Sequence, residues 1–323
     1  MLGGDEMSAL LEAKDVVLRY NAQGPDVVNH VSLEVHAGDA IGIVGESGSG
    51  KSSLARVLVG ALAPSSGEVL VEGQPWRQVS RKNVRRRDVQ MVFQDPYGSL
   101  NPRLTALETV SEVLRVARGA SASDANRQAA DLLREVGLPA DAFGRQAGGL
   151  SGGQCQRVGI ARALACEPKA LIADEPTSAL DVSVQAQILN LLNDLRERRG
   201  LAVVLISHDL DVIHYATRTT YVMHSGNVVE SGDTDEIFER PAHQYTLALL
   251  DSLPENGGAK LADRDIESQG CTFAARCPAM QPECLVAPPP PENIGPGHQA
   301  ACLYPSTAPD KTRRSTATER TPH

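Results

Sequence analysis

The sequence predicts an α/β fold built on a parallel sheet, and three observations predict it. A short apolar strand at residues 41–44 runs into a glycine-rich loop and then a helix-compatible segment. Two further apolar strands end in polar side chains, and residues 101–138 carry apolar positions three or four apart, as amphipathic helices do. The 323 residues are 41% hydrophobic and 22% charged, which suits one large domain with a smaller appendage.

The first element, the glycine-rich loop, matches the P-loop pattern in the strand–loop–helix context that the pattern requires. Its glycines let backbone amides point inward and surround phosphate oxygens. Lys51 is placed for the β- and γ-phosphates of a nucleotide, and the Ser52 hydroxyl for Mg²⁺. The predicted contact residues in this loop are Gly45, Glu46, Ser47, Gly48, Ser49, Gly50, Lys51, Ser52 and Ser53.

The next elements are strands that place polar groups at the same edge of the sheet. Gln94 follows the strand before Pro96, where it could bind Mg²⁺ or water. Asp174 and Glu175 end the strand at 170–173, where Asp174 suits Mg²⁺ and Glu175 suits a general base. His208 follows the strand at 201–206 and could stabilise a transition state there. Each of these side chains, taken alone, could equally be a solvated group at a strand end.

A second anion-binding pattern lies about a hundred residues after the P-loop. In "LSGGQ", residues 150–154, Ser151 can cap a helix whose N-terminus favours negative charge, and two glycines allow close approach. One chain therefore carries two candidate phosphate sites.

Six motifs in this order resemble the nucleotide-binding subunit of an ATP-binding-cassette (ABC) transporter. They are "GESGSGKS", "FQDP", "LSGGQ", "LIADEP", "SALD" and "SHD", and the resemblance covers residues 8–250. It implies an ATPase core with an antiparallel β subdomain and a helical subdomain at about 102–165. It also implies that Tyr20 stacks on adenine and that Asp181 belongs to the loop that follows the hydrolytic strand.

The resemblance accounts for the second anion site. In this family two ATPase subunits close face to face, and each ATP lies between the P-loop of one and the signature helix of the other. Ser151, Gly152, Gly153 and Gln154 are therefore expected to bind, in trans, the γ-phosphate held by the partner. The family usually has Arg or Gln at the position of Cys155, and we expect activity to survive that change.

The sequences of the motifs resemble one branch of this superfamily in particular. "FQDPYGSLNPR" and "PAHQYTLALLDSLP" resemble the second of the two paired ATPases of oligopeptide, dipeptide and nickel importers. This implies ATP and Mg²⁺ as cofactors and a second ATPase subunit, either another copy or a different chain. It also implies two transmembrane permeases, an extracytoplasmic solute-binding protein, and a peripheral position at the cytoplasmic face of the membrane.

Beyond the core, four cysteines predict a separate module at residues 251–305, followed by a disordered tail at 306–323. In some members of the branch that this chain resembles, four such cysteines carry a [4Fe–4S] cluster, and the resemblance implies the same here. Zinc and no metal at all remain alternatives, although tight Cys-x-x-Cys pairs typical of zinc are absent. The cysteines are Cys271, Cys277, Cys284 and Cys302.

Composition limits the rival functions. The net charge of −9 disfavours broad affinity for nucleic acid, so a cassette ATPase acting on DNA or ribosomes is the weaker alternative. Intact Lys51, Glu175 and His208 argue against a catalytically silent subunit. No apolar run is long enough to cross a bilayer, and the acidic N-terminus does not resemble a secretory signal.

Overall fold

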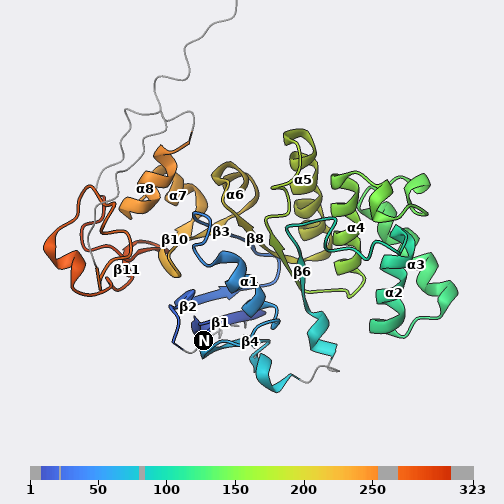
Figure 1. Ribbon diagram of the computed structural model, residues 1–323, viewed down its shortest axis with the longest axis horizontal. Helices are drawn as coiled ribbons and strands as arrows, with labels where there is room; N and C mark the ends of the chain where they lie inside the picture. Colours follow the sequence, from blue (N-terminus) through green and yellow to red (C-terminus); the bar gives the residue numbers. More distant parts are fainter. Residues whose placement is uncertain (1–8, 22, 80–83, 254–267, 307–323) are drawn as a thin grey trace, which may run out of the picture.

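The computed structural model of the protein describes residues 9–21, 23–79, 84–253 and 268–306 (Figure 1). Within them the chain forms an eight-stranded sheet, a four-stranded sheet and the helices that pack around them. The described part contains no helix long and apolar enough to span a membrane.

The large sheet has the strand order β11-β12-β10-β9-β3-β8-β7-β6. Its five strands from β9 to β6 are parallel, so their carboxyl ends meet at one edge. The strands expected before the glycine-rich loop, before Gln94, at 170–173 and at 201–206 are all confirmed. The parallel strands are β3 (Ala40–Val44), β6 (Val89–Val92), β7 (Ala170–Asp174), β8 (Ala202–Ser207) and β9 (Thr219–His224).

The large sheet is buried on both faces, as continuous apolar strands predict. Val204 and Ile206 of β8 face a core shared with helix α1 (Lys51–Leu58) and the small sheet. Val203 and Leu205 face the opposite core, which the remaining helices cover. Those over the sheet are α5 (Val182–Arg199), α6 (Leu210–Ala216), α7 (Thr234–Glu239) and α8 (Gln244–Asp251).

The small sheet is antiparallel, with the order β2-β1-β4-β5, and supplies the expected antiparallel layer. Its inward positions, such as Leu11 and Val35, pair directly and join the core under α1. The strands are β1 (Leu11–Leu18), β2 (Val28–Val35), β4 (Ser66–Val71) and β5 (Gln74–Pro75).

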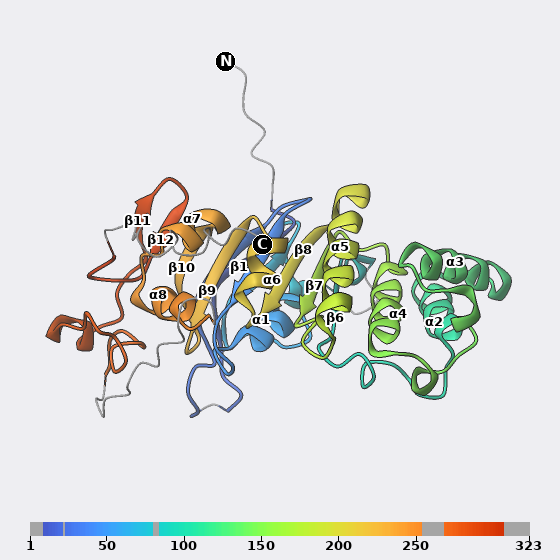
Figure 2. The same ribbon diagram turned by 90° about the horizontal axis from the view of Figure 1, so that it is seen from above.

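Three helices pack together at one end of the molecule and form the expected helical subdomain (Figures 1 and 2). They are α2 (Ala106–Arg118), α3 (Ala122–Glu135) and α4 (Gly152–Leu164). Each begins at a side-chain cap, because Thr105, Ser121 and Ser151 accept hydrogen bonds from the backbone N–H three residues on.

The described C-terminal segment, residues 268–306, lies at the opposite end of the molecule (Figure 2). It extends the large sheet, because β12 (His298–Ala300) pairs with β10 (Asn227–Asp233), and β11 (Glu292–Gly295) pairs with β12. The sequence predicted a module separate from the core, whereas the structure shows that strands of this segment continue the core sheet. Nearly all of the expected disordered tail, residues 307–323, lies outside the described residues.

Candidate active site

The glycine-rich loop connects β3 to α1 at the carboxyl edge of the parallel sheet. Gly48 and Gly50 have φ angles of 81° and 100°, a region that side chains rarely adopt. A Cβ on Gly50 would also lie 2.3 Å from the carbonyl oxygen of Val27. The loop therefore needs glycine at this position for both backbone conformation and space.

Lys51 lies under the loop with its ammonium group turned into it. Its Nζ donates to the carbonyl oxygens of Gly45 and Glu46 at 2.7 and 2.8 Å. Burial lowers the pKa of Lys51, and the carboxylates of Glu175, Asp174 and Glu46 act in the opposite direction. The result is a positive charge at the centre of the loop, held near three carboxylates.

Ser52 and Asp174 lie next to each other although they are 122 residues apart in sequence. The Ser52 hydroxyl donates to Asp174 Oδ1 at 3.0 Å, at the point where β7 ends. Burial raises the pKa of Asp174, and the hydrogen bond from Ser52 partly opposes it. Hard oxygen donors of this kind are the ligands that Mg²⁺ prefers. The two side chains therefore fit a magnesium site beside the loop.

Glu175 lies between two polar side chains from neighbouring strand ends. Gln94 Nε2 donates to Glu175 Oε2 at 2.8 Å, and His208 Nδ1 lies 3.1 Å from Glu175 Oε1. Glu175 also has a φ angle of 44°, which is unusual for a residue other than glycine and is typical of functional sites. A carboxylate held in this way can orient a water molecule and accept its proton.

One open cleft of about 710 Å³ is lined by Lys51, Ser52, Gln94, Glu175 and His208. Asp174 lies beside it, hydrogen-bonded to Ser52. Tyr20 is 55% exposed near its rim, and its hydroxyl lies 3.0 Å from Ser53 Oγ. Val27 and Leu249 also line the cleft, and the sequence analysis did not identify them. The lining residues are Val27, Glu46, Ser47, Gly48, Gly50, Lys51, Ser52, Ser53, Gln94, Glu175, His208 and Leu249.

The "LSGGQ" residues do not line this cleft. Ser151 caps α4, with its Oγ accepting from Gln154 N at 3.3 Å and its own N–H donating to Gln154 Oε1 at 3.0 Å. A Cβ on Gly153 would lie 2.5 Å from Val184 Cγ1, so the N-terminus of α4 packs closely on α5, which Asp181 caps. The "LSGGQ" residues therefore lie apart from the P-loop of the same chain, with Ser151 exposed at the helix N-terminus.

Cys155, the next residue of α4, is fully buried. Its Sγ lies 3.6 Å from the carbonyl oxygen of Ala147, and burial raises the pKa of the thiol to about 11. The thiol therefore fills space in the helical subdomain and does not reach the surface of α4.

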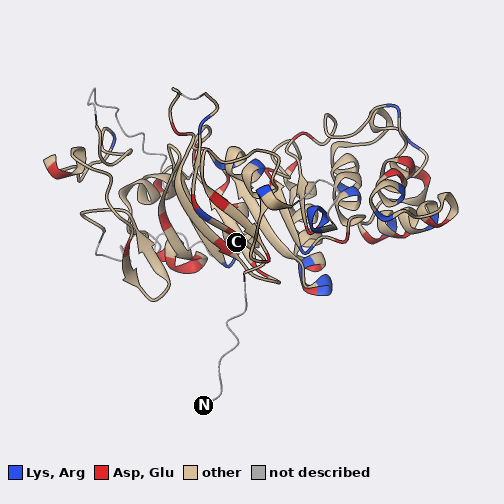
Figure 3. Ribbon diagram, turned by 90° about the horizontal axis from the view of Figure 1, so that it is seen from below, with Lys and Arg blue, Asp and Glu red and all other residues tan. Residues whose placement is uncertain are grey.

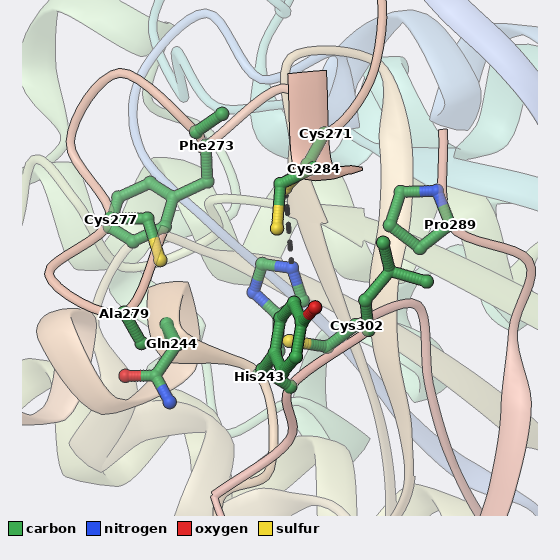
Figure 4. A pocket seen from close by; sticks show the side chains of 12 residues that line it. His243, Gln244, Cys271, Phe273, Cys277, Ala279, Cys284, Pro289 and Cys302 are labelled. Carbon is green, nitrogen blue, oxygen red and sulfur yellow. Dashed lines mark hydrogen bonds between the residues drawn. The ribbon is translucent and has the colours of Figure 1, made fainter. Parts of the chain in front are cut away.

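The four C-terminal cysteines line one cavity together with His243 (Figure 4). Cys271 Sγ lies 3.9 Å from His243 Nε2, and burial raises the pKa of the Cys271 and Cys302 thiols. Across the described ranges, however, no three His, Cys, Asp or Glu side chains are placed to hold a metal ion together. The four cysteines expected to bind one metal group therefore line one cavity, but they do not form a site for a single ion.

Two residues that the sequence analysis did not identify contact the P-loop from the C-terminal part of the chain. The backbone N–H of Glu46 donates to the Tyr245 hydroxyl at 2.8 Å, and Arg276 donates to both carboxylate oxygens of Glu46. These contacts span 199 and 230 residues of sequence, and no local pattern signals them.

Comparisons with known proteins match both halves of the chain. Residues 28–178 match the family described as "ABC transporter", and residues 229–284 match "Oligopeptide/dipeptide transporter, C-terminal region". The chain is 44% identical over 287 residues to the "Probable peptide ABC transporter ATP-binding protein y4tS" of Sinorhizobium fredii, covering 85% of this chain and 81% of the relative. It is 40% identical over 291 residues to the "Oligopeptide transport ATP-binding protein OppF" of Haemophilus influenzae, covering 85% and 88%.

Solved structures of ATP-binding cassettes are also similar to the core of this chain. A dimeric structure of the ATP-binding cassette MJ0796 bound to ADP and Pi in a post-hydrolysis state matches with a TM-score of 0.63 at 32% identity, covering 69% of this chain and 98% of that one. The protein cbiO1 of Clostridium perfringens, part of the cbiONQ transporter complex, matches with a TM-score of 0.64 at 26% identity, covering 76% and 96%.

Proposed function

The chain belongs to the ATP-binding proteins of ABC transporters, in the oligopeptide and dipeptide branch, and we propose that its ATPase cycle drives uptake of peptide-like solutes. The observation that carries the assignment is the convergence of Lys51, Ser52, Glu175, Gln94 and His208 on one cleft, with Asp174 hydrogen-bonded to Ser52 beside it. The six residues come from four strand ends of one sheet edge. The cargo class rests on the names of the relatives.

Each group in the cleft has a distinct task in this proposal. The loop amides and Lys51 hold the phosphates of ATP. Ser52, Asp174 and Gln94 hold Mg²⁺, which when bound neutralises phosphate charge. Glu175 accepts a proton from the attacking water, while Gln94 and His208 keep the Glu175 carboxylate and the water aligned. Tyr20, on the rim beside Ser53, stacks on the adenine.

The ATP-binding site is complete only when a second ATPase subunit supplies its own "LSGGQ" surface. What supports this is that Ser151, Gly152, Gly153 and Gln154 lie at a helix N-terminus where Ser151 is exposed, and not in the cleft of their own chain. The MJ0796 cassette, similar to this core, is itself dimeric. We favour a different chain as the partner, because ATPases of this branch are usually paired, and a second copy is the alternative.

The remaining partners follow from the branch. We propose two permease subunits, an extracytoplasmic solute-binding protein, and a peripheral position at the cytoplasmic face of the membrane. Action on nucleic acid or ribosomes is the weaker proposal, since the net charge is −9 and Figure 3 shows acidic and basic positions mixed along the elements. Co-purification from detergent-solubilised membranes would identify the permeases, and cargo binding to the solute-binding protein would identify the solute.

Glu175→Gln tests the catalytic assignment. The amide keeps the shape of the side chain but cannot accept the proton, so ATP turnover is expected to fall at least about 100-fold. ATP remains bound, so the variant is expected to form an ATP-dependent dimer that size-exclusion chromatography with light scattering detects. Unchanged turnover in Glu175→Gln would remove Glu175 from its role as base.

We also propose that Cys271, Cys277, Cys284 and Cys302 hold a [4Fe–4S] cluster, with zinc as the alternative. What supports a cluster is the set of four thiols on one cavity, a donor set that suits iron–sulfur chemistry.

An ultraviolet–visible spectrum and metal analysis of anaerobically purified protein test this assignment. A cluster gives a brown protein with about four irons per chain, lost together when Cys284 is replaced by alanine. Cys166→Ala is the matched control, since Cys166 is outside the cavity. A colourless, fully folded protein without iron would end the cluster proposal, and one zinc per chain would favour the alternative.

A further inference from the structure

The C-terminal segment makes direct contact with the phosphate-binding loop. Arg276 Nη1 and Nη2 donate to the two carboxylate oxygens of Glu46 at 2.9 and 3.0 Å, a paired geometry that only a guanidinium provides. Glu46 is the second residue of the P-loop, directly after Gly45. The backbone N–H of the same residue donates to the hydroxyl of Tyr245 on α8. Glu46 is therefore held through both its side chain and its backbone.

The groups that hold Glu46 are themselves fixed by packing. The Arg276 guanidinium lies 5.7 Å from the ring centroid of Phe273, and Phe273 packs edge-on against Tyr245. Phe273 and Tyr245 are each only 1% exposed. Because Arg276 directly precedes Cys277, which lines the cysteine cavity, the contact connects the wall of that cavity to the nucleotide-binding loop.

The charge of Glu46 gives this contact a specific consequence. The Glu46 carboxylate lies on the cleft that receives the triphosphate, where an uncompensated negative charge would repel the phosphates. The hydrogen bonds from Arg276 hold the pKa of Glu46 below its ordinary value, so the side chain stays ionised. Arg276 supplies the compensating positive charge from outside the P-loop motif.

We propose that Arg276 is a positioning residue for ATP, which neutralises Glu46 and fixes the start of the P-loop from the C-terminal segment. The inference rests on the proposed role of residues 45–53 in holding the phosphates. It makes the C-terminal segment a determinant of nucleotide affinity. Glu175, Gln94 and His208, which carry out the chemical step, lie outside this contact.

Arg276→Gln is the first test, made on the full-length chain by equilibrium titration with a fluorescent ATP analogue. The dissociation constant is expected to rise about three- to ten-fold, the size expected for one partly exposed charge interaction. Arg199→Gln is the matched control, because Arg199 makes the same two-bond contact with Glu135. The exposed fractions of the two arginine side chains are nearly equal, 31% for Arg199 and 30% for Arg276.

The double variant Glu46→Gln with Arg276→Gln separates charge compensation from a general loss of packing. Removing the carboxylate together with its partner is expected to recover most of the lost affinity, and Arg276→Lys to recover part of it. In the assembled transporter Arg276→Gln should raise KM for ATP while kcat at saturating ATP changes less than about two-fold. A double variant that binds no better than Arg276→Gln would overturn the proposal.

Melting temperatures of all the variants are measured beside the titrations, so that a folding defect is not taken for lost affinity. If Arg276→Gln and Arg199→Gln bind ATP as the wild type does, the inference fails while the proposed function stands. If the wild type itself binds no ATP, or if Lys51→Ala binds as the wild type does, the proposed function fails as well.

Discussion

At the scale of single residues, the cleft holds charges that burial alone disfavours. Lys51 and Asp174 are each 4% exposed, and burial lowers the pKa of the first and raises that of the second. In the proposed site, phosphate brings negative charge to Lys51 and Mg²⁺ brings positive charge to Asp174. Ligand binding therefore relieves an electrostatic cost that is already present in the folded chain, which favours tight binding of the metal–nucleotide pair.

His224 gives a pH prediction at the same scale. Its ring is buried against Tyr245 and Phe273, its Nδ1 lies 2.8 Å from Thr272 Oγ1, and burial lowers its pKa to about 4. In the unfolded chain His224 binds a proton near pH 6.5, whereas in the folded chain it does so only near pH 4. The free energy of unfolding is therefore unaffected by this group above pH 6.5 and falls as the pH drops towards about 4.

Denaturant unfolding at several pH values between 7 and 4 measures this effect. Replacing His224 with Gln is expected to reduce the change of the unfolding free energy with pH by up to about 1.4 kcal/mol per pH unit. Parallel slopes for wild type and His224→Gln would contradict the assignment.

At the scale of elements, the N-terminus of α4 serves two purposes with one residue. Ser151 closes a capping box with Gln154, and the same hydroxyl lies on the surface proposed to meet the partner's ATP. Ser121 caps α3 in the same way, with its Oγ accepting from Asp124 N at 3.2 Å. α3 has no proposed contact with nucleotide. Comparing Ser151 with Ser121 therefore distinguishes the loss of a helix cap from the loss of nucleotide binding.

Ser151→Ala and Ser121→Ala are both expected to lower the free energy of unfolding by about 1 kcal/mol. Only Ser151→Ala, introduced together with Glu175→Gln, should weaken the ATP-dependent dimer, because we propose that the signature surface binds ATP in trans. Analytical ultracentrifugation with ATP measures the dimer. Equal dimerisation of the two variants would argue against the proposed role of Ser151 in trans.

At the scale of the whole molecule, a buried carboxylate joins the C-terminal segment to the core. Glu230 of β10 has a fully buried side chain that accepts from Ala242 N, His243 N and His298 Nε2 at 2.8, 2.9 and 2.7 Å. These partners belong to the chain before α8 and to β12. One side chain thus fixes the start of α8, the cysteine cavity wall and β12 relative to one another.

Glu230→Ala is expected to lower the free energy of unfolding by about 3 kcal/mol, since it leaves buried N–H groups without an acceptor. Glu236→Ala is the control, because Glu236 forms only an exposed pair with Arg240 and should change stability by less than about 1 kcal/mol. Chemical denaturation measures both. A loss in Glu230→Ala no larger than in Glu236→Ala would show that Glu230 is not the link.

Much of the fold could be predicted from sequence because its signals are local. The strand at 41–44 is apolar throughout, the P-loop has fixed spacing, and Ser151 with Gln154 forms a capping pattern within four residues. Parallel strands end at a common edge, so even the meeting of Ser52 with Asp174 could be expected. The exception was residues 292–300, whose short strands carry too few residues for a periodic signal.

The sequence by itself thus determined the nucleotide-binding core, its polar strand ends and the residue types that face the cleft. Only the tertiary structure decided that Arg276 and Tyr245 hold Glu46, that Glu230 binds His298, and that the cysteines line a single cavity. The physical reason is the distance along the sequence over which each kind of interaction acts. Periodicity, caps and loop geometry act over a few residues, whereas these contacts join segments 68 to 230 residues apart and arise only when the whole chain packs.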